Sequence, residues 1–326
     1  MKNSSNTLKK YFKDFIKDIC AISEIYLYHG DLTDILSFLE NCKEWIDLND
    51  INSEDKARFL VQYVKLLQNN KFINEIDFEK EIEMLEIAVK LSESKEDKKI
   101  LADAFDLIGT CIYSSGIHNG DFLDAYNYFN KALMIRDQSN DKLGLTKSFF
   151  NLGLYHENKK DSNEDDKQKA FEFYKKGLKI AIEEDFKLEQ SYFYRHLAYQ
   201  YQYYKNDLDK ALDYHIKSKD LREEIGFNVY MQSSYFAIGM VYFFKEDYIN
   251  SSIYFKKAYE VAMIINRVIK LRKMILLRGE DIETSKGKSL ASIFYKQQLD
   301  IALDLNDKKG YNDLKKKIDL ISDNKN

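Results

Sequence analysis

Residues 236–259, FAIGMVYFFKEDYINSSIYFKKAY, carry two helical patterns around a short polar turn. Gly239 stands among large apolar residues in the first pattern. In the second, Ser251, Phe255 and Ala258 follow at intervals of four and three residues, which places them on one face of a helix. Glycine inside a helix costs about 1 kcal/mol relative to alanine, so Gly239 needs a packing reason. We therefore predict two helices whose backbones approach closely at Gly239.

The same pair of patterns recurs along the chain. Ungapped copies of the second helix begin at Ala125, Ala170, Ala211, Ser251 and Ala291. The residues predicted to pack the pairs together are Gly109, Ala125, Phe129, Gly153, Ala170, Tyr174, Ala198, Ala211, Gly239, Ser251, Phe255 and Ala258. The helix expected over 266–278 carries no small residue at the corresponding place, which predicts a degenerate repeat there. A helix, a tight turn and a second helix at intervals of about forty residues are typical of a solenoid.

These residues resemble the tetratricopeptide repeat (TPR) family, whose first helix carries a small residue and whose second helix carries alanine, an aromatic residue and alanine. The chain contains no proline, so the family's terminal proline is missing, and the spacing exceeds the family's usual repeat of about 34 residues. The resemblance is therefore to a long-repeat variant of about 40–45 residues. It implies an all-α fold: a right-handed superhelical solenoid of about seven antiparallel helix pairs, closed by a capping helix near the C-terminus.

The predicted organisation is a single solenoid over residues 1–326. Within it, residues 1–95 form divergent helix pairs, residues 96–264 hold the clearest repeats, and residues 265–326 hold the degenerate repeat and the capping helix KKGYNDLKKKIDLIS.

Composition narrows the classes of function. The 50 basic and 54 acidic side chains give a net charge of −4, which offers no basic field for nucleic acid. Charged residues interrupt every apolar run near the N-terminus, so we expect neither a signal peptide nor a membrane span, and a cytoplasmic protein. Three dispersed cysteines and five histidines without paired spacing predict no metal site, and no motif suggests a cofactor or catalytic residues. We expect a protein that is not an enzyme.

The resemblance to TPR proteins also predicts which side chains line a concave groove. These are Lys147, Phe150, Asn151, Leu154, Tyr192, Arg195, Tyr199, Gln202, Tyr203, Phe236 and Met240. Rings bury apolar side chains, and amides hydrogen-bond a peptide backbone, so such a surface suits a peptide or protein ligand. The alternative is that the superhelix closes on itself and buries this surface. In the aromatic run over 192–204, we assign Tyr194 and Tyr201 to the core between helices.

One further pattern has two interpretations. Arg267, Lys270, Arg272, Lys273 and Arg278 lie on one predicted helix with apolar neighbours. They could contact an acidic partner, or they could form an ordinary solvated face.

Three functions remain open at this point. The first is a non-catalytic scaffold that binds a protein or peptide in its groove. The second is an intracellular receptor for a short peptide pheromone, which controls a partner protein and resembles the bacterial receptors built from repeats of this length. The third is a hydrolase or phosphatase, for which we find no cluster of carboxylates and amides facing the groove.

Overall fold

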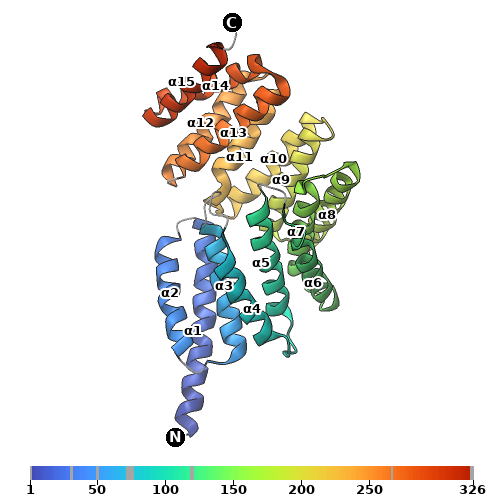
Figure 1. The fold of residues 1–326 in the computed structure, drawn as a ribbon, viewed down its shortest axis with the longest axis vertical. Helices are drawn as coiled ribbons and strands as arrows, with labels where there is room; N and C mark the ends of the chain where they lie inside the picture. Colours follow the sequence, from blue (N-terminus) through green and yellow to red (C-terminus); the bar gives the residue numbers. More distant parts are fainter. Residues whose placement is uncertain are drawn as a thin grey trace. The chain divides into compact units, whose positions relative to one another are not determined.

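The computed structural model describes residues 2–29, 32–48, 51–70, 77–117, 121–265 and 267–323. These residues form helices and turns without a strand, which confirms the all-α prediction (Figure 1). Their fifteen α-helices match the predicted seven pairs and one further helix. The helices are α1 (Lys2–His29), α2 (Thr33–Leu48), α3 (Ser53–Asn70), α4 (Glu79–Ser92), α5 (Lys99–Gly116), α6 (Ala125–Gln138), α7 (Lys142–Asn158), α8 (Glu164–Glu183), α9 (Lys187–Tyr203), α10 (Leu208–Glu224), α11 (Met231–Phe244), α12 (Tyr248–Ile264), α13 (Val268–Lys286), α14 (Lys288–Asp304) and α15 (Lys308–Asp323), with a 3-10 turn, η1 (Asn228–Tyr230), before α11.

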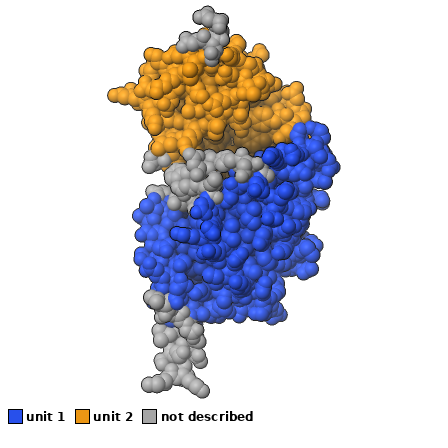
Figure 2. All heavy atoms as spheres, viewed as in Figure 1, with its two compact units in different colours: residues 1–193 blue, residues 194–326 orange. Residues whose placement is uncertain are grey.

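The chain divides into two compact units, residues 1–193 and residues 194–326 (Figure 2). The division falls inside α9. Each unit has its own core of consecutive helices. A single solenoid over the whole chain, with the three subdivisions given above, stays a prediction.

Consecutive helices pack in pairs, and the first helices of neighbouring pairs also meet, as α3 does with α5 and α5 with α7. All twelve residues predicted to pack the pairs are buried. A Cβ atom on Gly239 would lie 2.6 Å from the ring of Phe255, and one on Gly153 would lie 2.3 Å from the ring of Tyr174. Each glycine thus leaves room for a ring from the second helix of its pair.

The expectation of a degenerate repeat after residue 264 was wrong in one respect. Helix α13 continues to Lys286, and Gly279 takes the small-residue position in it. A Cβ atom at Gly279 would lie 2.1 Å from the ring of Tyr295 on α14. Gly279 lies forty residues after Gly239, but the predicted helix ended one residue too early to include it.

A recurring turn joins many helices. A residue with positive φ precedes an aspartate that caps the next helix, as in Asn206 (φ 52°) before Asp207 and Glu246 (φ 61°) before Asp247. The Asp207 carboxylate accepts a hydrogen bond from Lys210 N at 2.9 Å. Asparagine tolerates the left-handed conformation and aspartate satisfies the free N–H groups of a helix start, so these dipeptides define tight turns locally.

Within the aromatic run, burial differs from the prediction. Phe193 is the core ring: it is 1% exposed, and its ring would lie 2.0 Å from a Cβ atom on Gly177. Tyr194 and Tyr201 are only half-buried, against Tyr214 of α10 at 5.3 and 5.5 Å between ring centroids. Both tyrosines pack between helices, but at the edge of the pair rather than in its centre.

The turn between α7 and α8 is held by Asp166, whose side chain is 3% exposed. Its carboxylate lies 3.0 Å from His156 Nδ1 and 2.7 Å from Lys159 Nζ, and it closes a capping box with Asn163. Burial alone would raise the pKa of Asp166, but the hydrogen bonds from Lys159 and His156 outweigh it and lower the pKa to about 2.

We expect Asp166→Asn to cost about 1–2 kcal/mol near neutral pH, because the variant loses the charged partner of Lys159. A carboxylate whose pKa is lowered in the folded state stabilises the protein above its unfolded pKa of about 4, and that contribution disappears as the pH falls toward its folded pKa. The gap in melting temperature between parent and variant should therefore be constant from neutral pH to about pH 5 and shrink below about pH 4. Asp165→Asn is the control, because Asp165 is 71% exposed and should show almost no gap. A gap for Asp166→Asn that persists at pH 3, or no gap at neutral pH, would contradict the assignment.

Candidate functional site

The second unit contains a cavity of about 400 Å³ among α9, α11 and α13. Its wall is partly apolar, with side chains such as Met240, Phe243 and Phe244 from α11. Polar groups come from the end of α9 and from α13. The full lining is Gln202, Tyr203, Asn206, Leu208, Met240, Phe243, Phe244, Glu246, Arg278, Asp281, Ile282, Ser285, Lys286 and Leu290. The lining thus combines six apolar side chains with eight polar or charged ones.

Gln202 is the most informative polar group in this lining. The side chain is 6% exposed, yet neither its amide nitrogen nor its amide oxygen has a hydrogen-bond partner in the structure. A buried amide without partners costs free energy, so a donor and an acceptor from a ligand or from water would stabilise it. The structure therefore leaves the hydrogen-bonding capacity of the Gln202 amide unsatisfied beside the cavity.

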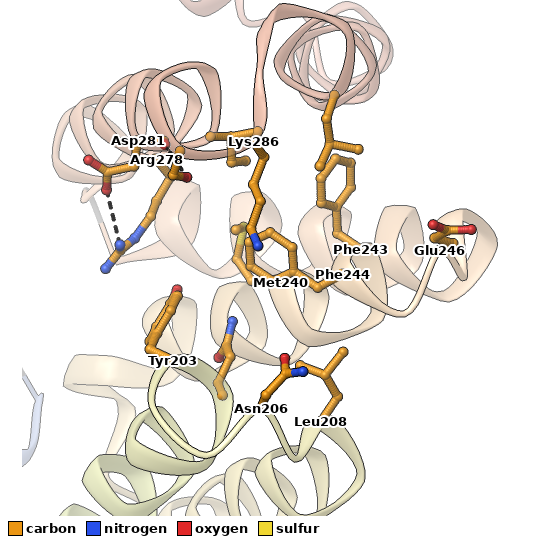
Figure 3. Close-up of a pocket in the computed structure, with 14 residues that line it drawn as sticks. Tyr203, Asn206, Leu208, Met240, Phe243, Phe244, Glu246, Arg278, Asp281 and Lys286 are labelled. Carbon is orange, nitrogen blue, oxygen red and sulfur yellow. Dashed lines mark hydrogen bonds and ion pairs between the residues drawn. The ribbon is translucent and has the colours of Figure 1, made fainter.

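Charged side chains line the cavity along α13. Figure 3 shows Tyr203 of α9 and Arg278 of α13 pointing toward one another, and Lys286 reaching toward the space between α13 and α11. The guanidinium carbon of Arg278 lies 5.7 Å from the centroid of the Tyr203 ring. Arg278 also forms an ion pair with Asp281 at 3.1 Å. The cavity thus offers both charge signs along its α13 edge.

A row of cations and tyrosines continues along α9 and α13. On α9, Arg195 donates to the Tyr199 hydroxyl at 3.3 Å, and Tyr199 stacks on Tyr203 with centroids 6.2 Å apart. Near the start of α13, Lys270 Nζ lies 5.8 Å from the centroid of Tyr230, and the guanidinium carbon of Arg222 lies at the same distance. We call six of these residues the cationic face, and its members are Arg195, Tyr199, Tyr203, Tyr230, Lys270 and Arg278, whereas Arg222 is fully buried beneath it.

The pKa values of nearby groups reflect this charge. Burial, with Arg267 and Arg195 as neighbouring cations, lowers the pKa of Lys270 to about 8. Burial, with Arg195 and Arg222, lowers the pKa of His215 to about 3, so its ring is neutral. For Tyr199, burial alone would raise the pKa, but Arg195 and other guanidinium groups outweigh it and lower the pKa. Nearby positive charge favours ionised tyrosine and disfavours protonated lysine and histidine, so its effect has the direction of all three pKa shifts. Burial acts in the same direction at Lys270 and His215.

In the first unit, the residues predicted to line the groove are half-buried, and they are Lys147, Phe150, Asn151, Leu154 and Tyr192. The amide nitrogen of Asn151 donates to Asp106 Oδ1 at 3.0 Å. The Phe150 ring packs against Tyr192 and Phe193, with centroids 5.6 and 5.8 Å apart. Asn151, Phe150 and Tyr192 therefore already have partners within the unit.

The predicted groove residues of the second unit have three different environments. Gln202, Tyr203 and Met240 line the cavity, whereas Arg195 and Tyr199 lie on the cationic face. Phe236 does not line the cavity: it packs on Phe255 with centroids 5.2 Å apart, although Met240, which does line it, is equally buried. The lining residues Asn206, Asp281 and Lys286 were not predicted: Asn206 and Lys286 lie at helix ends, and Asp281 lies beyond residue 278, where the predicted helix stopped.

Among the described residues, no group of three or more histidine, cysteine, aspartate or glutamate side chains could hold a metal ion. His118 lies outside the described residues. None of the described helices is both long enough and apolar enough to cross a membrane.

No family model matches the chain, and no curated protein matches its sequence. Solved structures do match its fold. BtubC (BKLC) from P. vanneervenii is 15% identical, with a TM-score of 0.52 over 77% of this chain and 92% of that one. A Rap protein in complex with competence and sporulation factor is 12% identical, with a TM-score of 0.50 over 96% of this chain and 98% of that one. A STAND signal-transduction ATPase with a tetratricopeptide repeat sensor, from Pyrococcus horikoshii, is 16% identical, with a TM-score of 0.49 over 81% of this chain and 41% of that one.

The chain has a TPR-like helical-repeat fold. At these identities the similarity extends to the fold alone, which agrees with the fifteen described helices and their packing in consecutive pairs.

Proposed function

We propose that this chain is a non-catalytic helical-repeat scaffold that binds a peptide segment in the cavity of its second unit. The observation that carries the proposal is Gln202, a buried amide that lines the cavity and has both hydrogen-bonding atoms unpaired in the structure. The apolar wall beside it, including Met240 and Phe244, would bury a side chain of the bound segment. That the protein is cytoplasmic and binds no nucleic acid stays a prediction.

A finer candidate lies within this proposal. The ligand would be a short peptide, and its binding would control a partner protein. Support comes from the Rap protein, whose fold is similar over almost the whole length of this chain and which was solved in complex with a competence and sporulation factor. The scaffold and receptor candidates differ in their ligand, which is a segment of a folded protein in the first and a free peptide in the second.

The test uses two neighbouring positions at the end of α13. Ser285 and Thr284 are both exposed, and each hydroxyl donates to the carbonyl four residues earlier, but only Ser285 lines the cavity. Peptides selected from a random display library on the parent protein should bind Ser285→Trp at least about tenfold more weakly, because the indole would occupy the cavity mouth. Thr284→Trp is the matched control and should bind these peptides as the parent does.

Fluorescence polarisation with the selected peptides measures both affinities. Equal affinity of the two variants would place binding elsewhere, and failure of the library to yield any binder would overturn the peptide-binding function. A preference for free peptides over the same sequences within a folded domain would favour the receptor candidate.

A further inference from the structure

The cationic face and the cavity meet at two shared residues of the second unit. Tyr203 and Arg278 are members of both. On α9, Tyr199 stacks on Tyr203 and accepts a hydrogen bond from Arg195. On α13, Lys270 lies eight residues before Arg278. Because residues four apart stack on one side of a helix, Arg195, Tyr199 and Tyr203 share one side of α9, and Lys270 and Arg278 share one side of α13.

The spacing of the cations limits the ligand. Lys270 and Arg278 are eight residues apart on α13, which corresponds to about 12 Å along the helix axis. This is the separation of the two backbone positions, and the charged groups lie beside different rings, Lys270 by Tyr230 and Arg278 by Tyr203. A ligand with two anionic groups can therefore contact both. An extended peptide rises about 3.3 Å per residue, so two acidic groups roughly four residues apart would match this distance.

The tyrosine rings add a second feature. The rings of Tyr199, Tyr203 and Tyr230 each lie within 6 Å of a cation of the face, which is Arg195, Arg278 and Lys270 respectively. Such contacts hold cations at the protein surface, with their side chains ordered before a ligand arrives. The rings also offer apolar area to the residues between the two acidic groups of a peptide.

We propose that the cationic face binds a short extended peptide that carries two acidic side chains about four residues apart, with Lys270 and Arg278 as their contacts and Gln202 paired to the peptide backbone. This inference rests on the proposed function and specifies the class of ligand. It also selects between the two interpretations of the basic helix. Lys270 and Arg278 lie beside the rings of the face, and the ion pair of Arg278 with Asp281 is exposed, whereas Arg272 pairs with the buried Asp307 and Lys273 is exposed to solvent.

The same geometry makes binding depend on pH. Lys270 faces the Tyr230 ring and the cations Arg195 and Arg267, and these groups together with burial keep its pKa near 8. A bound carboxylate would favour the charged lysine, so affinity should be highest below about pH 8 and fall as the pH rises above it. Ionisation of Tyr199, whose pKa is also lowered, would add negative charge and act in the same direction. Lys270→Met should flatten this profile.

The experiment compares three fluorescent pools of C-terminally amidated pentapeptides with random central residues. The first and last residues are both glutamate, both glutamine or both lysine. The glutamate pool should bind at least about tenfold more tightly than the glutamine pool, and its affinity should fall as salt is raised from about 50 to 500 mM. Lys270→Met and Arg278→Gln should each remove most of this preference, whereas Lys273→Met, the matched control on α13, should keep it.

The outcomes separate the inference from the function on which it rests. If the glutamine pool binds as tightly as the glutamate pool, peptide binding stands and the acidic ligand is wrong. If no pool binds, the peptide-binding function fails as well. Tighter binding of an oligothymidine probe than of the glutamate pool, lost in Lys270→Met, would overturn the peptide in favour of nucleic acid. Equal losses in Lys273→Met and Lys270→Met would show a general charge effect and contradict the assigned contacts.

Discussion

Replacing Arg136 by methionine is expected to destabilise the first unit by about 3–5 kcal/mol. Arg136 lies on α6 and is 1% exposed. Its guanidinium group reaches Asp103 at 2.7 Å and Asp106 at 3.2 Å, and it donates to the Ser148 hydroxyl at 2.8 Å. Burial alone would lower the pKa of Arg136, but the two carboxylates outweigh it and raise the pKa, so the group is charged. Methionine fills a similar volume but leaves Asp106, which is 10% exposed, without a cation.

Unfolding in urea, followed by the fluorescence of Trp45, measures this loss, because the only tryptophan of the chain lies in the first unit. The control is Arg58→Met, whose partner Glu54 and own side chain are 37% and 42% exposed, so its cost should stay below about 1 kcal/mol. Adding Asp103→Asn and Asp106→Asn to Arg136→Met should recover part of the stability, since no buried carboxylate is then left unpaired. An Arg136→Met protein that unfolds at the urea concentration of the parent would refute the buried ion-pair network.

The second large effect is expected for Gly239→Leu, which should cost about 1–3 kcal/mol through overpacking. Leucine is the better helix former by about 1 kcal/mol, so propensity alone predicts the opposite sign. The ring of Phe255 leaves no room for a Cβ atom at Gly239, because that atom would lie only 2.6 Å away. The ring cannot move aside easily: Phe255 is fully buried, with Phe236 and Phe294 at 5.2 and 5.7 Å.

A double-mutant cycle tests the contact itself. Gly239→Ala and Phe255→Leu should each lower the melting temperature, and the double variant should lose less than the sum, because the smaller side chain makes room for the new methyl group. Glu260→Leu on the exposed side of α12 is the control for adding leucine and should change the melting temperature little. If Gly239→Leu melts with the parent, the register of the α11 and α12 pair is wrong.

The candidate site could be predicted only in part. The repeat register placed Gln202, Tyr203 and Met240 toward a groove, and all three line the cavity. The same register assigned Phe236 to the groove, although it does not line the cavity. Phe236 and Met240, four residues apart on α11, are equally buried, but Phe236 packs on Phe255 and Phe294 of neighbouring helices while Met240 borders the cavity, and no pattern within α11 carries that information.

The sequence by itself determined the helices, their pairing and the turns between them, because these depend on local interactions. A small residue opposite a ring, as in Gly153 and Tyr174, needs only two neighbouring helices. An aspartate cap such as Asp207 needs only the next three residues.

Only the tertiary structure decided where a ligand could bind. The cavity brings together α9, α11 and α13, whose contributing residues are roughly forty positions apart from helix to helix. The basic helix was visible in the sequence, but its division into Arg272 bound to Asp307, Lys273 in solvent and Lys270 beside Tyr230 was not. The physical reason is that helical periodicity gives the direction of a side chain around its own axis, whereas burial, charge and free hydrogen-bonding capacity depend on which other helices pack there.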